Sequence, residues 1–357
     1  MKVIRNLNII IRPLNDLCNL NCIYCDTKER YSRYAIRRSM IKLGTIKKLI
    51  SDIKNSGLQR VRFTWHGGEP LLLDDSFYQN VFALQKELRI EYTNTLQTNG
   101  TLVNEKRLLF FKKNDISIGF SLDGNKYLHN TYRFNNKETF ELVLNNIWLA
   151  KSLGVRFSII TVVHEKNVKD VDEICDFIIN LRPPNGFIVT PLFLGQGELS
   201  SLSIKVEQFS EFLRKLYDKL KKVPEIPCNY VYGVERGLSG SIPKLCFLSG
   251  RCANFISING IGDIFSTCHE NSQYYLGNIN KEPLSKILEK HLLEYEGKIV
   301  SQFINQSIYR EMGSDPALIY FQGKGCTRRL LNGKDPYLTS YIDLISYAKR
   351  EYSKKPS

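Results

Sequence analysis

Three cysteines lie close together near the start of the chain, in the segment CNLNCIYC. Cys18, Cys22 and Cys25 could hold a metal group, because thiolates ligate zinc and iron–sulfur clusters. A four-iron cluster with three protein ligands leaves one iron open to bind another molecule. Two other interpretations fit the same spacing: a structural zinc site with a distant fourth ligand, and thiols packed as small hydrophobic groups.

The composition of the chain limits the class of protein. Its 357 residues, 43% of them hydrophobic, suffice for one large α/β domain with a smaller addition. No segment approaches about 18 consecutive apolar residues, and the start lacks a signal-peptide cleavage site, so we expect a cytoplasmic protein without a membrane partner. Nine cysteines in such a chain favour metal binding over disulfides.

The chain is basic, with a net charge of +14 and a pI near 9.2. This charge is compatible with an anionic partner and equally with an ordinary solvated surface. The densest basic segment, residues 28–42, directly follows the three cysteines. It could therefore face a substrate.

The elements that must position these cysteines follow a repeating pattern. Apolar, β-rich segments alternate with segments of helical periodicity, which predicts βα units and a parallel sheet. Six units do not close an eight-stranded barrel, so we expect an open partial (β/α)6 barrel with its site at the carboxyl ends of the strands. The expected strands are residues 7–13, 59–65, 91–97, 116–122, 156–163 and 186–193. The expected helices include residues 45–55, 77–88, 105–113, 138–152, 168–179 and 337–352.

Polar motifs follow the first four expected strands. The cysteines come after the first strand, HGGEP after the second, QTNG after the third, and SLDG ends the fourth. Because parallel strands place their carboxyl ends at one edge, these motifs should line one pocket. Gln97 and Asn99 then lie at the barrel mouth, where we consider Gln97 a candidate catalytic residue.

The motif Cys-x3-Cys-x2-Cys, with the aromatic Tyr24 before its last cysteine, resembles the signature of the radical S-adenosylmethionine (SAM) superfamily. The motifs GGEP and SLDG follow in the order typical of that family. The resemblance implies that the open iron chelates the amino and carboxylate groups of SAM. Reduction of the cluster by a flavodoxin- or ferredoxin-type donor then yields a 5′-deoxyadenosyl radical, which takes a hydrogen atom from the substrate.

The resemblance also implies roles for single residues. Gly67 and Gly68 would let the backbone approach the ligand, and Glu69 would accept a hydrogen bond from the SAM ammonium. Ser121 and Asp123 resemble a ribose-binding pair. Alternatives remain open: a simple turn at SLDG, a surface salt bridge at Arg133, and a core position for Leu192. The full set of implied SAM contacts is Tyr24, Gly67, Gly68, Glu69, Pro70, Ser121, Asp123, Arg133 and Leu192.

A second group of cysteines follows the barrel. Cys246, Cys252, Cys268 and Cys326 resemble the ligands of the first auxiliary four-iron cluster in SPASM/twitch extensions, with zinc or unligated thiols as alternatives. A β-hairpin turning at Asn259-Gly260 would deliver Cys268. The dense cysteine run of a second auxiliary cluster is missing, so we expect two clusters in all. The expected domains are a barrel at 1–230, an auxiliary domain at 231–335, and a terminal helix and tail at 336–357.

Three further residues have open roles. His269 follows Cys268, where the sulfatase-maturing branch carries an acidic residue, which argues against formylglycine formation. It is a candidate base or a structural histidine. Cys175 should pack in the core, and Cys228 is either structural or a hydrogen-atom donor.

The leading functional hypothesis is a maturase of a ribosomally made precursor peptide that forms a carbon–carbon (cyclophane-type) or thioether crosslink. The early cysteines leave no space for an N-terminal leader-binding domain, so the leader would be recognised elsewhere. The alternative is a radical SAM dehydrogenase or epimerase acting on a small molecule or peptide. A nucleic-acid partner lacks a supporting module. A non-catalytic iron–sulfur scaffold would not need GGEP and SLDG.

Overall fold

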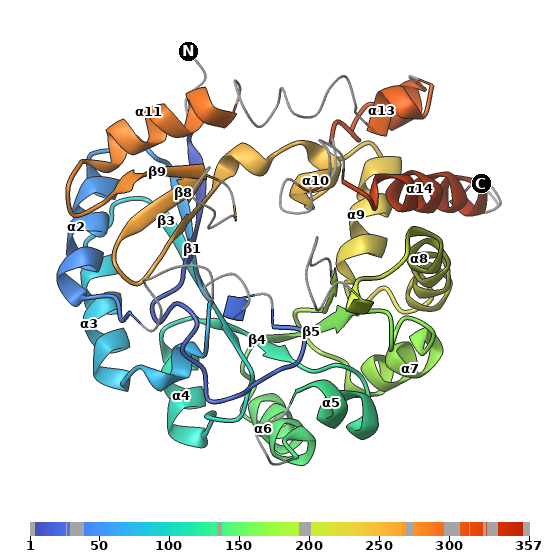
Figure 1. Ribbon diagram of the computed structural model, residues 1–357, viewed down its shortest axis with the longest axis horizontal. Coiled ribbons are helices and arrows are strands. Elements are labelled where there is room, and N and C mark those ends of the chain that lie inside the picture. Colours follow the sequence, from blue (N-terminus) through green and yellow to red (C-terminus); the bar gives the residue numbers. More distant parts are fainter. Residues whose placement is uncertain are drawn as a thin grey trace. The chain divides into compact units, whose positions relative to one another are not determined.

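A computed structural model describes most of the chain and divides it into two compact units (Figure 1). Unit 1 comprises residues 1–121, 132–157 and 253–299, and unit 2 comprises residues 122–131, 158–252 and 300–357. The described residues are 4–25, 27–28, 39–133, 138–192, 201–266, 268, 274–295, 308–313, 315–323, 326 and 335–352. No helix among them is both long enough and apolar enough to cross a membrane.

The sheet of unit 1 has parallel strands at its centre. β1 (Asn6–Ile11) pairs in parallel with β2 (Arg60–Trp65), followed by β3 (Glu91–Thr98) and β4 (Ser117–Ser121). Alternate side chains of β1 are buried, as expected for one face of a sheet packed on helices. The expected strands of this unit are therefore confirmed.

The other side of β1 carries a second set of strands. β7 (Phe255–Ile258) pairs in parallel with β1, while β8 (Asp263–Ser266) and β9 (Tyr275–Asn278) continue as antiparallel neighbours. β7 and β8 are the hairpin expected at Asn259-Gly260. Its attachment to β1 was not foreseen, because a strand sequence does not specify its partner.

Helices cover the sheet of unit 1. α2 (Leu43–Lys54), α3 (Asp75–Gln85) and α4 (Glu105–Lys113) lie along one side of the strands in Figure 1. α6 (Phe140–Ser152) and α11 (Leu284–Glu294) complete the unit, and the Leu284 amide donates to Asp52 of α2 over 2.9 Å. The helical periodicity of the sequence predicted α2, α3, α4 and α6.

Unit 2 combines two parallel strands with a group of helices. β5 (Phe157–Val163) pairs with β6 (Phe187–Pro191), which confirms the last two expected strands. The helices are α5 (Lys126–Tyr132), α7 (Val171–Leu181), α8 (Val206–Leu220), α9 (Asn229–Leu238), α10 (Cys246–Ser249), α13 (Ile308–Glu311) and α14 (Leu338–Tyr352).

An aromatic cluster holds the helices of unit 2 together. The Phe209 ring of α8 lies 5.9 Å from Tyr230 of α9 and 5.0 Å from Tyr337. Tyr341 of α14 stacks on Phe247 at 4.8 Å. These contacts fix the terminal helix, which was expected at residues 337–352, against α8. The expected domain boundaries stay a prediction.

Candidate active site

The three N-terminal cysteines lie in the loop that follows β1. All three are half-buried cysteines that form no disulfide. The loop is closed locally, because the Cys25 amide donates to the Cys22 carbonyl over 3.2 Å. Lys28 Nζ donates to the Leu20 carbonyl over 2.6 Å and fixes the other side of the loop. Each cysteine is thus carried by an ordered turn of backbone.

The GGEP motif after β2 packs directly on the cysteine loop. The Gly68 amide donates to the Asn15 carbonyl over 2.7 Å, and the Glu69 amide donates to the Leu17 carbonyl over 2.9 Å. A Cβ at Gly68 would lie 1.9 Å from the Leu17 oxygen, so a side chain is excluded there. Gly67 has a φ of +111°, which favours glycine. The close approach seen here is to the cysteine loop, whereas the sequence suggested an approach to the ligand.

Glu69 is fully buried between the second and third strand ends. Its Oε1 accepts from the Thr98 hydroxyl over 2.8 Å and the Leu71 amide over 3.0 Å, and its Oε2 accepts from the Asn99 amide over 2.8 Å. Burial raises the pKa of this carboxyl to about 7, although these hydrogen bonds and the Arg107 charge act in the opposite direction. The side chain therefore joins two loops of the site. Its expected contact with the SAM ammonium stays a prediction.

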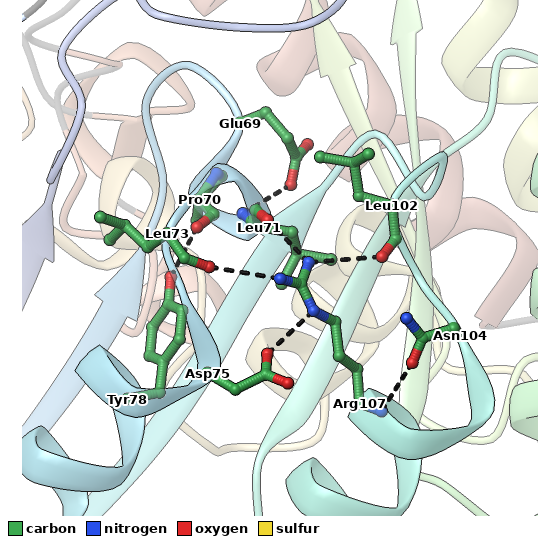
Figure 2. A network of polar contacts seen from close by, with 9 residues as sticks. All are labelled: Glu69, Pro70, Leu71, Leu73, Asp75, Tyr78, Leu102, Asn104 and Arg107. Carbon is green, nitrogen blue, oxygen red and sulfur yellow. Dashed lines mark hydrogen bonds and ion pairs between the residues drawn. The ribbon is translucent and has the colours of Figure 1, made fainter.

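Arg107 of α4 holds the backbone that follows Glu69 (Figure 2). Its guanidinium donates to the carbonyls of Leu71 over 2.6 Å and Leu73 over 3.3 Å. Its Nε forms an ion pair with Asp75 at 2.9 Å. A planar guanidinium with several donors suits such a clamp. The role of Arg107 was not predicted from the sequence, since an arginine in a polar helix gives no sign that its side chain points inward.

Asn99 connects the Glu69 network to the cysteine loop. Its Nδ2 donates to Asn19 Oδ1 over 2.8 Å and lies 3.6 Å from Cys18 Sγ. The Leu20 amide also donates to Cys18 Sγ over 3.4 Å. Burial raises the pKa of the Cys18 thiol to about 11 in the protein without metal. A bound metal would reverse this preference, because coordination deprotonates a thiol.

Tyr24 and Arg133 form a buried pair beside the loop. The Arg133 guanidinium lies 5.3 Å from the centroid of the Tyr24 ring, within the range of a cation–π interaction. Arg133 is only 7% exposed, which excludes the solvated surface salt bridge. The Ile23 amide donates to the Tyr132 carbonyl over 3.0 Å and fixes the loop next to Arg133 within unit 1. The expected contact of Arg133 with SAM stays a prediction.

Two further site residues of unit 1 meet at the ends of β3 and β4. Gln97 Nε2 donates to Ser121 Oγ over 2.9 Å. Ser121 is buried and Gln97 is half-buried. Pro70 begins the short 3-10 helix Pro70–Leu72, and the Tyr78 hydroxyl donates to its carbonyl over 3.0 Å. These positions agree with a shared strand-end site, while their contacts with SAM stay predictions.

The remaining SAM contacts expected from the sequence lie in unit 2. Asp123 is buried, and its Oδ1 accepts from the Val162 amide over 3.0 Å. The Leu192 amide donates to the Val163 carbonyl over 2.8 Å, and the Leu192 carbonyl lies 3.1 Å from the Tyr337 hydroxyl. Leu192 is thus a buried residue with both backbone groups in contact with protein. His269 lies outside the described residues.

The donor set of the loop suits an iron–sulfur cluster. Cysteine thiolates are the ligands of such clusters, and two N–H donors lie close to the Cys18 sulfur, from Leu20 at 3.4 Å and from Asn99 at 3.6 Å. Among the described residues, no group of three Cys, His, Asp or Glu side chains is arranged to hold a single metal ion. Cys18, Cys22 and Cys25 supply the thiolates.

The second cysteine group belongs mainly to unit 2. Cys246 begins α10, and Cys252 begins the short helix Cys252–Asn254. The chain before Cys326 packs on α10, because the Gly323 amide donates to the Leu248 carbonyl over 2.7 Å. The Cys326 amide donates to Asp335 over 2.7 Å. Cys268 follows β8 in unit 1, and its place in the same ligand set stays a prediction.

The two cysteines outside both groups are buried. Cys175 lies on the inner face of α7, which confirms its expected place in the core. Cys228 precedes α9 and is also buried, and burial raises the pKa of its thiol to about 11. Cys175 and Cys228 are therefore both buried in the way expected of residues that pack in a core.

Residues 13–178 match the Radical SAM superfamily. This part of the chain is a radical SAM domain. The match agrees with the positions of the cysteine loop, GGEP and SLDG at the ends of β1, β2 and β4. It confirms the resemblance drawn from the motifs. SAM and an iron–sulfur cluster are the cofactors of such a domain.

Two relatives extend the similarity beyond the radical SAM domain. The chain is 26% identical over 326 residues to the cysteine-type anaerobic sulfatase-maturating enzyme of Clostridium novyi, covering 86% of this chain and 84% of that enzyme. It is 29% identical over 311 residues to the serine-type enzyme of Bacteroides thetaiotaomicron, covering 79% of this chain and 74% of that enzyme. The chain thus contains a radical SAM domain and is similar over most of its length to these maturating enzymes.

Solved structures confirm the fold. The structure described as native anSMEcpe with bound AdoMet has a TM-score of 0.80 at 23% identity, over 97% of this chain and 98% of that one. The structure of anSMEcpe with AdoMet and the Kp18Cys peptide also has a TM-score of 0.80, at 21% identity, over 97% of both chains. The α/β partial barrel expected for the radical SAM domain is therefore confirmed.

Proposed function

We propose that this chain removes a hydrogen atom from a residue of a peptide substrate and completes a two-electron oxidation of that substrate. The observation that carries the proposal is the close contact between the cysteine loop and GGEP. At Gly68 the two backbones lie so close that no side chain fits between them. Such a junction keeps the cysteines next to the motif assigned to SAM. When bound there, the reduced cluster supplies the electron that splits SAM.

Residues of the strand ends are assigned to SAM. Gly67 to Pro70 would bind its methionine part together with Arg133, whose buried cation suits a carboxylate. Ser121, oriented by Gln97, and Asp123 would bind the ribose, and Leu192 would border the adenine. Tyr24 supports Arg133 from the cysteine loop. Each side chain here orients the cofactor and excludes water from the reacting centre.

A peptide substrate is supported by the relatives. Those in Clostridium novyi and Bacteroides thetaiotaomicron are sulfatase-maturating enzymes, and a structural neighbour holds the Kp18Cys peptide. We assign this chain an intramolecular crosslink in a precursor peptide, of carbon–carbon or thioether type. The bond replaces two bonds to hydrogen: one hydrogen atom goes to 5′-deoxyadenosyl, and the second leaves as a proton and an electron.

An acceptor is needed for that second electron. Cys246, Cys252, Cys268 and Cys326 are the residues proposed to hold an auxiliary four-iron cluster that would take it. A flavodoxin- or ferredoxin-type protein would supply the first electron. The alternative is oxidation of a peptidyl cysteine or serine to an aldehyde, which the sulfatase-maturating relatives favour. A dehydrogenase or epimerase acting on a small molecule or peptide is a further candidate.

Two measurements test this function. The reconstituted protein, supplied with SAM and dithionite without oxygen, should release 5′-deoxyadenosine, and the Cys18→Ala, Cys22→Ala, Cys25→Ala triple variant should not. Cys175→Ala is the matched control, because Cys175 is a buried thiol outside both cysteine groups. Equal release from the triple variant and the wild type would refute the assignment.

Mass spectrometry of candidate peptides then separates the outcomes. A loss of two hydrogen atoms without a carbonyl that reacts with hydrazide supports the crosslink. An aldehyde supports the sulfatase-type oxidation instead. Unchanged mass with deuterium uptake from the solvent indicates epimerisation. Oxidation of a small alcohol with no change in any peptide contradicts the peptide substrate.

A further inference from the structure

Cys18 receives a side-chain contact from a different strand end of unit 1. Asn99, at the end of β3, places its Nδ2 3.6 Å from Cys18 Sγ, within the range of an N–H···S hydrogen bond. The Leu20 amide approaches the same sulfur at 3.4 Å. Backbone donors such as Leu20 come with the loop itself. Asn99 is instead a separate side chain that substitution can change without altering the loop sequence.

The orientation of the Asn99 amide is determined by its other partners. Its Oδ1 accepts from the Thr101 amide over 3.0 Å and from the Thr101 hydroxyl over 2.7 Å. Its Nδ2 also donates to Asn19 Oδ1 over 2.8 Å. Since these groups require an acceptor on one side and a donor on the other, the NH2 group faces Cys18. Asn99 is only 8% exposed, so water does not compete freely for this site.

The backbone of Asn99 is held by a buried carboxylate. Its amide donates to Glu69 Oε2 over 2.8 Å, while Glu69 Oε1 is occupied by Thr98 and Leu71. Arg107 in turn holds the Leu71 carbonyl over 2.6 Å, as Figure 2 shows. The half-buried Arg107 is itself fixed by its ion pair with Asp75. A continuous set of contacts thus runs from α4 to the sulfur of Cys18.

We propose that Asn99 is a positioning residue that sets the reduction potential of the cluster bound through Cys18, and that Glu69 and Arg107 hold Asn99 in place. This inference rests on the proposed function, because it requires that cluster. Hydrogen bonds to the sulfurs stabilise the more negatively charged reduced state and raise the potential. A less negative potential makes the cluster easier to reduce by a protein donor. Asn99 acts through Cys18 and is not itself a catalytic residue.

The test compares two variants with a control from the same strand. Asn99→Asp keeps the size and the Oδ1 acceptor but removes the donor and adds negative charge, whereas Asn99→Ser removes the contact. Asn94→Ala is the matched control, because Asn94 is a buried β3 residue that bonds Trp65 and Gln85. The readout is a potentiometric titration of the reconstituted full chain followed by electron paramagnetic resonance (EPR). We expect a more negative potential in both Asn99 variants, lowest in Asn99→Asp, and no shift in Asn94→Ala.

The outcomes separate this inference from the proposed function. A wild-type potential in an iron-loaded Asn99 variant overturns the inference. Loss of iron in both Asn99 variants, with Asn94→Ala fully loaded, also overturns it, since Asn99 would then serve only to hold the loop. An equal shift in Asn94→Ala counts against it in the same way. If the wild-type cluster shows no change in its EPR signal on addition of SAM, the proposed function itself fails.

Arg107→Lys tests the outer part of the contact set. Lysine keeps the charge but lacks the planar, five-donor fork with which arginine reaches Asp75 and the carbonyls of Leu71 and Leu73. We expect a smaller negative shift of the potential than in Asn99→Asp. Arg156→Lys is the control, because Arg156 pairs with Asp115 on the exposed surface of the same unit. An unchanged potential in Arg107→Lys removes Arg107 from the proposal.

Discussion

Glu69 and Gly68 of the GGEP motif contact other residues of the same site. Glu69 accepts three hydrogen bonds from the chain, and Gly68 touches the backbone just before Cys18. The motif that resembles a cofactor-binding signature is therefore also a structural junction between the first two strand ends. A change at such a junction should alter the metal site before any direct contact with SAM is lost.

Gly68→Ala tests the junction. The added Cβ would meet the Leu17 oxygen at 1.9 Å, so the loop must move. We expect a loss of about 2–3 kcal/mol in the free energy of unfolding, typical of overpacking, and a lower iron content after reconstitution. Urea denaturation and iron analysis measure both. Gly44→Ala in α2 is the control, because nothing lies within 4 Å of its Cβ position. The free energy of unfolding of Gly44→Ala should rise by up to about 1 kcal/mol, because alanine is favoured over glycine in a helix.

At the scale of elements, α11 and the β7–β8 hairpin are joined by a buried histidine. His291 of α11 lies 2.9 Å from Ser266 Oγ through Nδ1 and 2.7 Å from the Ala253 carbonyl through Nε2. The carbonyl can only accept, so Nε2 carries the proton and Nδ1 accepts from the serine hydroxyl. Ala253 follows Cys252, and Ser266 precedes Cys268 by two positions. The neutral imidazole thus ties together the segments next to two proposed cluster ligands.

The stability of the protein should therefore depend on pH through His291. Burial lowers the pKa of this imidazole below its usual value near 6.5. The unfolded chain, whose histidine has the usual pKa, therefore takes up the proton at a higher pH than the folded chain. The contribution of His291 to the free energy of unfolding is complete above about pH 6.5 and falls as the pH decreases toward the pKa of the folded state. His291→Gln should flatten this dependence, because glutamine does not titrate. Chemical denaturation between pH 5 and 8 measures it, and identical slopes for both proteins would contradict the assignment.

The sequence predicted the strands better than their arrangement. β-branched runs such as IIIR and FSIITVV were sufficient to place β1 to β6, and with them the motifs that follow these strands. The pairing of β7 with β1 depends on tertiary contacts, such as the Gly260 amide donating to Asn15 Oδ1 over 2.7 Å. Arg107 was missed for the same reason, since only the fold turns it toward Leu71.

At the scale of the whole molecule, the two cysteine groups predict its iron content. The first group lies in one loop of unit 1, and Cys246, Cys252 and Cys326 belong to unit 2. If both groups hold four-iron clusters, anaerobic reconstitution should give roughly eight irons per chain. Cys22→Ala should leave roughly four irons, because the remaining cluster belongs to the other group.

Substitutions in the second group decide whether Cys268 belongs to it. Cys252→Ala should leave roughly four irons and a cluster whose EPR signal still responds to SAM, because the loop of Cys18, Cys22 and Cys25 is unchanged. Cys268→Ser should give the same result if Cys268 is the fourth ligand of that group, since an auxiliary cluster with only three thiolates is held less firmly. Full iron content in Cys268→Ser, together with loss in Cys252→Ala, would show that the fourth ligand lies elsewhere. Cys228→Ala should retain all the iron, because Cys228 is a buried packing residue.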